Sequence, residues 1–312
     1  MKGNYKIMIY APIILFVYNR PDHARLVLEQ LKKNIEAKES QLFIFSDGPK
    51  NEKAVEKVKE VREMINSDEL SGCFKDVTVV EAPQNKGLAN SIISGVTEII
   101  NKYGRVIVLE DDSYCSCDFL CFMNECLNYY ENNSKIWSIG GFSHIGVDKI
   151  PDDYNSDVYI MGRTCSYAWA TWKNRWDSVD WEVKDYNKFK YDFLKRYRFN
   201  RYGRDRSFML DEQMRGKINS WAIRFCYAMF NHNMYTVLPI STKIKNIGRD
   251  GSGTHTLVGD TKMDVLLPDH AVPFKLENVE IDQRLVDLFK TKFDYGIMTN
   301  IRKYIKNIIL KI

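Results

Sequence analysis

Residues 106–115 read VIVLEDDSYC, an aliphatic run that ends in three consecutive carboxylates, Glu110, Asp111 and Asp112. A strand built from such β-branched and aliphatic residues is expected to be covered on both faces. Three acids at its carboxyl end cost folding energy unless something binds there. Because Mg²⁺ and Mn²⁺ prefer carboxylate oxygens together with substrate phosphates, the stretch predicts a divalent-cation site that holds a diphosphate. A solvated acidic turn is the alternative interpretation.

The composition indicates a globular protein of one large domain or two modest ones, since 45% of the 312 residues are apolar and 13% are aromatic. The net charge is only +4 and the basic residues are spread among acids, which excludes a broad nucleic-acid footprint. The chain shows no apolar signal segment and no uncharged membrane span. We therefore expect a cytoplasmic protein.

The seven cysteines are odd in number and lack paired CxxC spacing, so reduced thiols are expected. Cys115, Cys117, Cys121 and Cys126 lie close together in the sequence. Their spacing favours a helix with small apolar positions facing a core, and ligation of a soft metal is the alternative.

Four strand-like runs in the first half are each followed by a helical period. The pairs are residues 11–18 with 23–36, 41–46 with 52–65, 77–80 with 88–103, and 105–109 with 119–130. This alternation predicts an α/β fold with a mostly parallel sheet flanked by helices. Ligands of such sheets bind outside the carboxyl ends of the strands.

Polar residues follow each of the four predicted strands. They are Asn19 and Arg20, then Asp47, then Asn85 and Lys86, and finally the acidic triplet. Arg20 and Lys86 are candidates for binding phosphate, and Asp47 for accepting hydrogen bonds from a base or ribose. Neither GxGxxG after the first strand nor GxxxxGK[ST] is present, which disfavours a dinucleotide fingerprint or a P-loop.

The second half is rich in aromatic residues. Trp169, Trp172 and Trp176 have helical spacing, which favours a core face over a platform for sugar rings. Asp211 and Glu212 are expected to lead into a helix, where an acid pair is either a solvated helix start or a functional pair. Residues 243–256 are expected to form a mobile loop that closes over a ligand through Arg249 and His255, and a plain surface loop is the alternative.

The tail, residues 286–312, predicts a basic amphipathic helix. Such a helix either makes a peripheral contact with the inner face of a membrane or packs on its own protein. We favour packing on the protein.

In the order of its motifs the chain resembles the GT-A (Rossmann-like) nucleotide-sugar glycosyltransferases. Within that group it is similar to the animal N-acetylglucosaminyltransferase I family and to bacterial sugar transferases of surface-polysaccharide clusters. The resemblance spans about residues 10–260 and rests on Asn19-Arg20, Ser46-Asp47-Gly48, the acidic triplet, Asp211-Glu212-Gln213-Met214-Arg215 and the glycine loop up to His255. The chain departs from the animal enzymes at Gln213, where they carry an aromatic residue.

The resemblance implies a role for each matching residue. Asp47 would contact uracil, Arg20 the phosphates, Glu110 and Asp111 the ribose and the sugar, and Asp112 the Mn²⁺ or Mg²⁺. Asn19, Asn85, Lys86 and His255 are further candidates for donor binding. Asp211 would be the catalytic base, with Glu212 as the alternative because the alignment can slip by one residue.

The expected function is metal-dependent inverting transfer of a sugar, first N-acetylglucosamine, from a UDP-sugar. The acceptor would be a glycan or a lipid-linked saccharide of bacterial polysaccharide synthesis, and no nucleic acid is involved. A sugar nucleotidyltransferase and a catalytically silent carbohydrate-binding protein are the alternatives. We expect a catalytic domain over residues 1–260, with a nucleotide-binding half up to 135 and an acceptor-binding half from 136, followed by an extension over 261–312.

Overall fold

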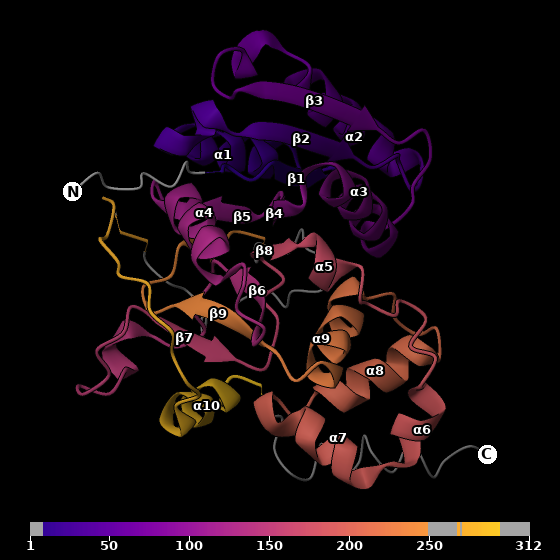
Figure 1. Ribbon diagram of the computed structural model, residues 1–312. Helices are drawn as coiled ribbons and strands as arrows, with labels where there is room; N and C mark the ends of the chain where they lie inside the picture. The colour runs from indigo at the N-terminus through magenta and orange to yellow at the C-terminus, as the bar shows by residue number, and fades with distance from the viewer. Residues whose placement is uncertain (1–8, 249–266, 269, 294–312) are drawn as a thin grey trace.

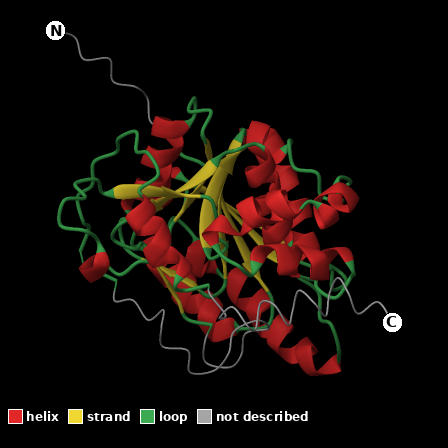
Figure 2. Ribbon diagram, turned by 90° about the horizontal axis from the view of Figure 1, so that it is seen from below, coloured by secondary structure: helices red, strands yellow, loops and turns green. Residues whose placement is uncertain are grey.

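The computed structural model describes residues 9–248, 267–268 and 270–293. In this part of the chain an eight-stranded sheet has the order β3-β2-β1-β4-β8-β6-β9-β7. Helices cover both of its faces (Figures 1 and 2). The strands are β1 (Ile13–Val17), β2 (Gln41–Ser46), β3 (Asp76–Glu81), β4 (Arg105–Glu110), β6 (Ile136–Gly140), β7 (Val158–Met161), β8 (Ala168–Trp172) and β9 (Tyr235–Pro239).

The first half forms the predicted βα units. Strands β1 to β4 pair in parallel and alternate with α1 (Pro21–Lys32), α2 (Glu52–Ile65) and α3 (Leu88–Tyr103). This confirms the α/β expectation. The first helix is displaced toward the N-terminus relative to the predicted range 23–36. It begins two residues earlier, at Pro21, a residue suited to the first helical turn, and it ends at Lys32 because the backbone becomes extended at Asn34 before a 3₁₀ turn over Ile35–Glu39.

The strand order puts a topological switch point at β1. The chain runs from β1 through β2 to β3 on one side, and then returns across the sheet to β4 on the other side. At such a switch point the loops after the two central strands diverge and leave room for a ligand. The loop after β1 and the acidic triplet after β4 therefore lie side by side at this switch point.

The second half extends the same sheet. Strand β8 pairs antiparallel with β4, β6 pairs with β8, β9 runs parallel to β6, and β7 closes the far edge. Its helices are α5 (Lys173–Trp176), α6 (Tyr186–Tyr191), α7 (Phe193–Phe199), α8 (Arg206–Met214) and α9 (Trp221–Asn231), and 3₁₀ turns lie at Val147–Lys149 and Asn200–Tyr202. The expected division at residue 135 falls within this continuous sheet.

The tryptophan segment is mainly a strand, so the predicted helical spacing is wrong. Trp169 and Trp172 lie three positions apart on β8, and alternation puts them on opposite faces of the sheet. Both are buried, as is Trp176. The core interpretation is therefore confirmed for all three rings, and Trp169 stacks on Trp221 with centroids 4.8 Å apart.

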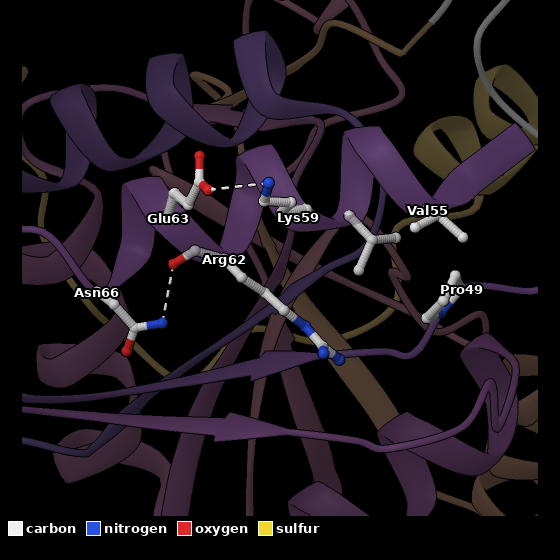
Figure 3. A pocket seen from close by; sticks show the side chains of 7 residues that line it. Pro49, Val55, Lys59, Arg62, Glu63 and Asn66 are labelled. Atoms are coloured by element: carbon white, nitrogen blue, oxygen red, sulfur yellow. Dashed lines mark hydrogen bonds and ion pairs between the residues drawn. The ribbon is translucent and has the colours of Figure 1, made fainter. Parts of the chain in front are cut away.

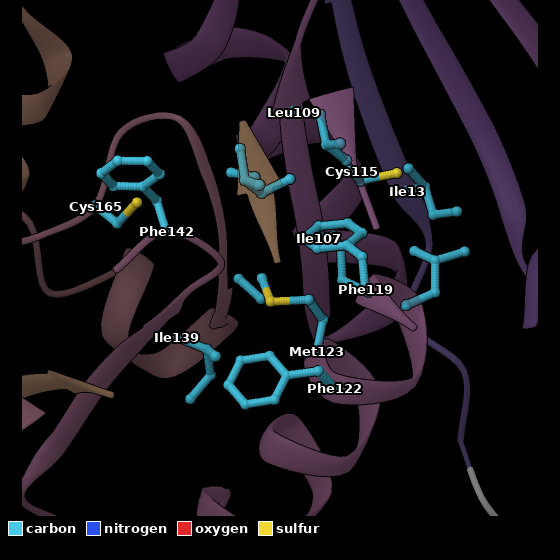
Figure 4. Packing of buried hydrophobic residues seen from close by; sticks show 14 of the residues in the cluster. Ile13, Ile107, Leu109, Cys115, Phe119, Phe122, Met123, Ile139, Phe142 and Cys165 are labelled. Carbon is cyan, nitrogen blue, oxygen red and sulfur yellow. The ribbon is translucent and has the colours of Figure 1, made fainter. Parts of the chain in front are cut away.

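Two apolar cores hold the helices on the sheet. On one face Ile13, Ile107 and Leu109 meet α1, α2 and the α4 helix (Phe119–Tyr130), whose Phe119 and Phe122 fill the space shown in Figure 4. On the other face Trp137, Trp169 and Trp176 pack against α3, α8 and α9. Cys115 is buried on the short strand β5 (Ser113–Cys115) and Cys126 on α4, while Cys117 and Cys121 are only half-buried, and all seven thiols are free.

Part of the predicted mobile loop is ordered structure. Strand β5 (Ser113–Cys115) pairs antiparallel with β10 (Ile244–Asn246), and the preceding Lys243 is buried in an ion pair with Asp118, at 2.6 Å. The prediction of a loop beginning at residue 243 is therefore wrong as far as residue 248. Residues 249–256, with Arg249 and His255, lie outside the described residues.

The described part of the tail packs on the protein. Helix α10 (Gln283–Lys290) buries Leu285, Val286 and Phe289 in the first core. Residues 294–312, which carry most of the predicted amphipathic helix, lie outside the described range. No helix in the described residues is both long and apolar enough to cross a membrane.

Candidate active site

Arg20 and the acidic triplet meet at the switch point of the sheet. Arg20 follows β1 and immediately precedes α1, and the acids follow β4, whose Glu110 is in register with Phe16 of β1. The Arg20 guanidinium donates to Asp111 and, at 3.2 Å, to Asp112. Parallel pairing of β1 with β4 thus brings together residues that are 91 positions apart.

The triplet holds more negative charge than Arg20 neutralises. Burial and the charges of Asp112 and Asp111 raise the pKa of Glu110 well above its ordinary value. Burial also raises the pKa of Asp111, against the opposing effect of Arg20. For Arg20, burial alone would lower the pKa, but the two aspartates outweigh it and raise it. A further positive charge would therefore be stabilised here.

The donor atoms fit a hard divalent cation. Within the described residues, Asp111 Oδ2 is buried without a hydrogen-bond partner, and such an atom is costly unless something binds it. Mg²⁺ and Mn²⁺ need only one or two protein carboxylates when substrate phosphates and water supply the other ligands. The described residues contain no preformed group of three ligating side chains, so substrate oxygens would have to complete the coordination.

The end of β10 lies directly over the Arg20–Asp112 pair. Ile247 donates its backbone N–H to the Asp112 carbonyl at 3.0 Å, and its own carbonyl is 3.2 Å from His23 Nε2. A Cβ at Gly248 would lie 2.5 Å from Asp112 Oδ2 and 2.8 Å from Arg20 Nη1. A residue without a side chain is therefore required at position 248 for this close approach.

Asp47 holds the loop between β3 and α3. Its carboxylate accepts four hydrogen bonds, from the backbone N–H groups of Gly48, Lys86 and Gly87 and from Asn85 Nδ2, at 2.8 to 3.0 Å. These bonds fill the usual acceptor positions of a carboxylate. The predicted contact of Asp47 with uracil stays a prediction, and it requires one of these bonds to be replaced.

The other predicted residues of this edge are accessible. Asn19 is half-buried next to Arg20, and the side chain of Lys86 is exposed at the start of α3. Arg62 of α2 supports the edge from behind by donating to the carbonyls of Asp47 and Ala82, at 3.4 and 2.7 Å.

The acid pair lies in the last turn of α8, so the prediction of a helix start there is wrong. Asp211 is 2% exposed. Arg196 of α7 donates to both of its oxygens at 2.9 and 2.8 Å, and the Tyr186 hydroxyl donates to Oδ1 at 3.0 Å. A carboxylate at a helix C-terminus opposes the helix dipole, and Arg196 compensates for this placement.

Glu212 is in a different environment on the same turn. Its Oε1 is buried and has no hydrogen-bond partner among the described residues, while Arg215 and Lys217 lie 3.7 and 3.6 Å away. The following Gln213 accepts a hydrogen bond from the Ser220 N–H at 2.7 Å and so fixes the turn between α8 and α9.

A contact between the two halves places α8 near the same edge of the sheet. Asn219, in the turn after α8, donates to Asn90 in the first turn of α3, at 3.5 Å. Helix α3 starts immediately after the loop that Asp47 holds. In the described residues no hydrogen bond or ion pair joins Asp211 or Glu212 to the triplet, so these remain two separate groups.

A hollow in the surface of the described residues lies elsewhere. Its volume is about 390 Å³, and Pro49, Val55, Val58, Lys59, Arg62, Glu63 and Asn66 line it beside α2. Figure 3 shows the Arg62 side chain reaching from this hollow toward the neighbouring strands. None of the predicted site residues lines it, and we place the candidate site at the acidic edge because three carboxylates share one arginine there and Asp111 Oδ2 has no hydrogen-bond partner in the described residues.

No family model matches the chain, and no curated protein matches it. Among solved structures, residues 1–349 of S. aureus TarS are 9% identical over 77% of this chain and 61% of that one, with a TM-score of 0.42. A longer TarS structure is 12% identical over 47% of this chain and 24% of that one, with a TM-score of 0.31.

A UDP-glucose pyrophosphorylase complexed with UDP-glucose is 12% identical over 76% of this chain and 91% of that one, with a TM-score of 0.39. This chain thus spans less than two thirds of either TarS structure.

Proposed function

We propose that this chain is a metal-dependent inverting glycosyltransferase that uses a nucleoside-diphosphate sugar. The observation that carries the proposal is the meeting of Arg20 with the three carboxylates of the triplet, of which Asp111 is buried, at the switch point of the sheet. A diphosphate needs both a cationic side chain and a metal with carboxylate ligands. A solvated acidic turn would need neither burial nor Arg20.

The donor would lie across the carboxyl ends of β1, β2 and β4. Arg20 and the exposed Lys86 bind its phosphates, and the loop held by Asp47 and Asn85 supports the nucleoside. Asp112, with Asp111 as a second ligand, would hold Mn²⁺ or Mg²⁺, and Glu110 would contact the ribose and sugar. When bound, the cation supplies charge neutralisation for the departing nucleoside diphosphate.

For the base we propose Glu212 in place of Asp211. Arg196 donates to both oxygens of Asp211 and Tyr186 donates to one of them, so neither oxygen is open to an acceptor hydroxyl. Glu212 Oε1 is buried and accepts no hydrogen bond in the described residues. A base in that position would take the proton of an acceptor hydroxyl as the hydroxyl oxygen attacks the anomeric carbon. The bond from that carbon to the nucleoside diphosphate breaks in the same displacement, so the configuration at the carbon is inverted.

Calorimetric binding of UDP-, GDP-, CMP- and dTDP-sugars, each with Mn²⁺ and with chelator, tests the proposal. We expect metal-dependent binding of one donor, UDP-N-acetylglucosamine first, and loss of that binding in Asp112→Ala. Asp76→Ala, at the exposed start of β3, is the matched control and should bind normally.

Two outcomes would contradict the proposal. Retained Mn²⁺-stimulated binding in Asp112→Ala would remove the metal assignment. Cleavage of the sugar nucleotide that requires pyrophosphate, with no transfer to any acceptor, would indicate a nucleotidyltransferase instead.

A further inference from the structure

The outer face of α6 and α7 exposes large apolar side chains. Tyr191 is 63% exposed, Leu194 58% and Tyr197 77%. These three residues, with the basic side chains described below, are called the α7 patch. Figure 1 shows α6 and α7 at the end of the molecule opposite β3, with α8 and α9 between them and the sheet. Clusters of exposed apolar residues rimmed by polar ones mark interaction surfaces.

The exposure follows from the way α7 is held. Asp192 caps the helix by accepting from the Lys195 N–H, and Arg196 and Phe199 face inward. Leu194 and Tyr197 are three positions apart, so they share the opposite face. The inner face is fixed by the ion pair with Asp211, and the outer face is therefore held out to solvent rather than exposed by loose packing.

The patch is strongly basic. Residues 186–204 contain seven lysines and arginines and one acid, Asp192. Arg196 is neutralised by Asp211 and Lys195 by Asp185. Among the described residues, no ion pair forms to Lys188, Lys190 or Arg198, which lie beside the apolar side chains.

We propose that the α7 patch docks on a membrane surface that contains anionic lipid. Tyrosine rings and a leucine fit the boundary between headgroups and acyl chains, and lysine and arginine are attracted to anionic headgroups. A second copy of this chain fits poorly, because a two-fold contact would bring two equally basic faces together. Single-stranded nucleic acid requires a basic groove, whereas this face is the outermost layer of helices.

Docking there would orient the candidate site. Helix α7 presents the patch on its solvent-exposed face and Arg196 on its buried face. Arg196 donates to Asp211, the residue next to Glu212. The acceptor side of the site would then lie near the membrane, which favours a lipid-linked acceptor. This last step rests on the proposed function, whereas the docking itself does not.

Co-sedimentation of the full chain with lipid vesicles tests the docking. The probes are vesicles of phosphatidylcholine alone and of phosphatidylcholine mixed with phosphatidylglycerol. We expect binding to the anionic vesicles only, and a loss of at least about tenfold in affinity for both Leu194→Ser/Tyr197→Ser and Lys188→Glu/Arg198→Glu. The matched control, Ile35→Ser/Val147→Ser, removes side chains that are 86% and 59% exposed elsewhere and should bind like the wild type.

Several results would overturn the proposal. One is absence of wild-type binding to anionic vesicles. Another is equal binding by wild type and both patch variants, which would assign the affinity to a different segment such as residues 294–312. A third is a patch-dependent change in oligomeric state or oligonucleotide binding without vesicle binding. Calorimetric donor binding in solution should be unchanged in the patch variants, so failure of docking and failure of the proposed function are distinguishable.

Discussion

Replacing Asp211 with asparagine should damage the fold more than it damages any binding site. The side chains of Arg196 and Asp211 are only 5% and 3% exposed, and two hydrogen bonds join them. Removing one charge of such a pair leaves the other buried without compensation, which costs about 3–5 kcal/mol. We therefore expect Asp211→Asn to lower the free energy of unfolding by about that amount.

Urea unfolding of four proteins measures this cost: wild type, Asp211→Asn, Arg196→Gln and the double variant. The double variant should be more stable than the sum of the two single losses predicts, because it leaves no unpaired charge. Glu212→Gln, one position away, should keep nearly wild-type stability and lose about two to four orders of magnitude in turnover. If Asp211→Asn kept wild-type stability and lost turnover instead, Asp211 would be the base and our assignment would be refuted.

Three further changes test other parts of the structure. Gly248→Ala should force Arg20 and Asp112 apart and weaken metal-dependent donor binding by about tenfold or more, which is about 1.4 kcal/mol. Gly146→Ala is the control, and an unchanged donor affinity in Gly248→Ala would contradict the prediction. Burial alone would raise the pKa of Asp118, but hydrogen bonds from Lys243 and Ser116 lower it, so its stabilising contribution is present above about pH 4 and is lost as the pH falls through the lower folded pKa. The difference in urea midpoint between wild type and Asp118→Asn should therefore shrink on acidification, and a constant difference would argue against the ion pair as its source. Asp47→Asn should speed hydrogen exchange at the Lys86 and Gly87 amides and cost about 1–3 kcal/mol, whereas unaltered exchange would show that the loop is held by other contacts.

The first half of the fold was predictable because its signals are local. The apolar periods gave the bounds of α2, α3 and α4 as the structure has them. Parallel strands end at one edge, so the meeting of Arg20 with Asp111 and Asp112 also followed from the alternation of strands and helices.

The second half was less predictable because its pattern is ambiguous. A spacing of three and four fits a helical face, but two large residues three apart on a strand that is buried on both sides produce the same spacing, as Trp169 and Trp172 do. Burial on both faces removes the alternation of apolar and polar residues that would have identified β8.

The partners of the candidate acids could not be predicted from the sequence. Arg196 is one of several arginines in a charged stretch, and only the packing of α7 on α8 selects it for Asp211. The contact between His23 and Ile247 joins residues 224 positions apart, with no local signal in either segment. The close approach at Gly248 likewise depends on the pairing of β10 with β5.

The position of β8 between β4 and β6 constrains how the chain folds as it is synthesised. Strand β4 leaves the ribosome early, but its second neighbour is complete only after residue 172. Until then β4 presents a row of unpaired backbone N–H and C=O groups, which is a template for association with other chains. A nascent chain that pauses before residue 172, or a fragment that ends near residue 135, should therefore depend on chaperones to stay soluble.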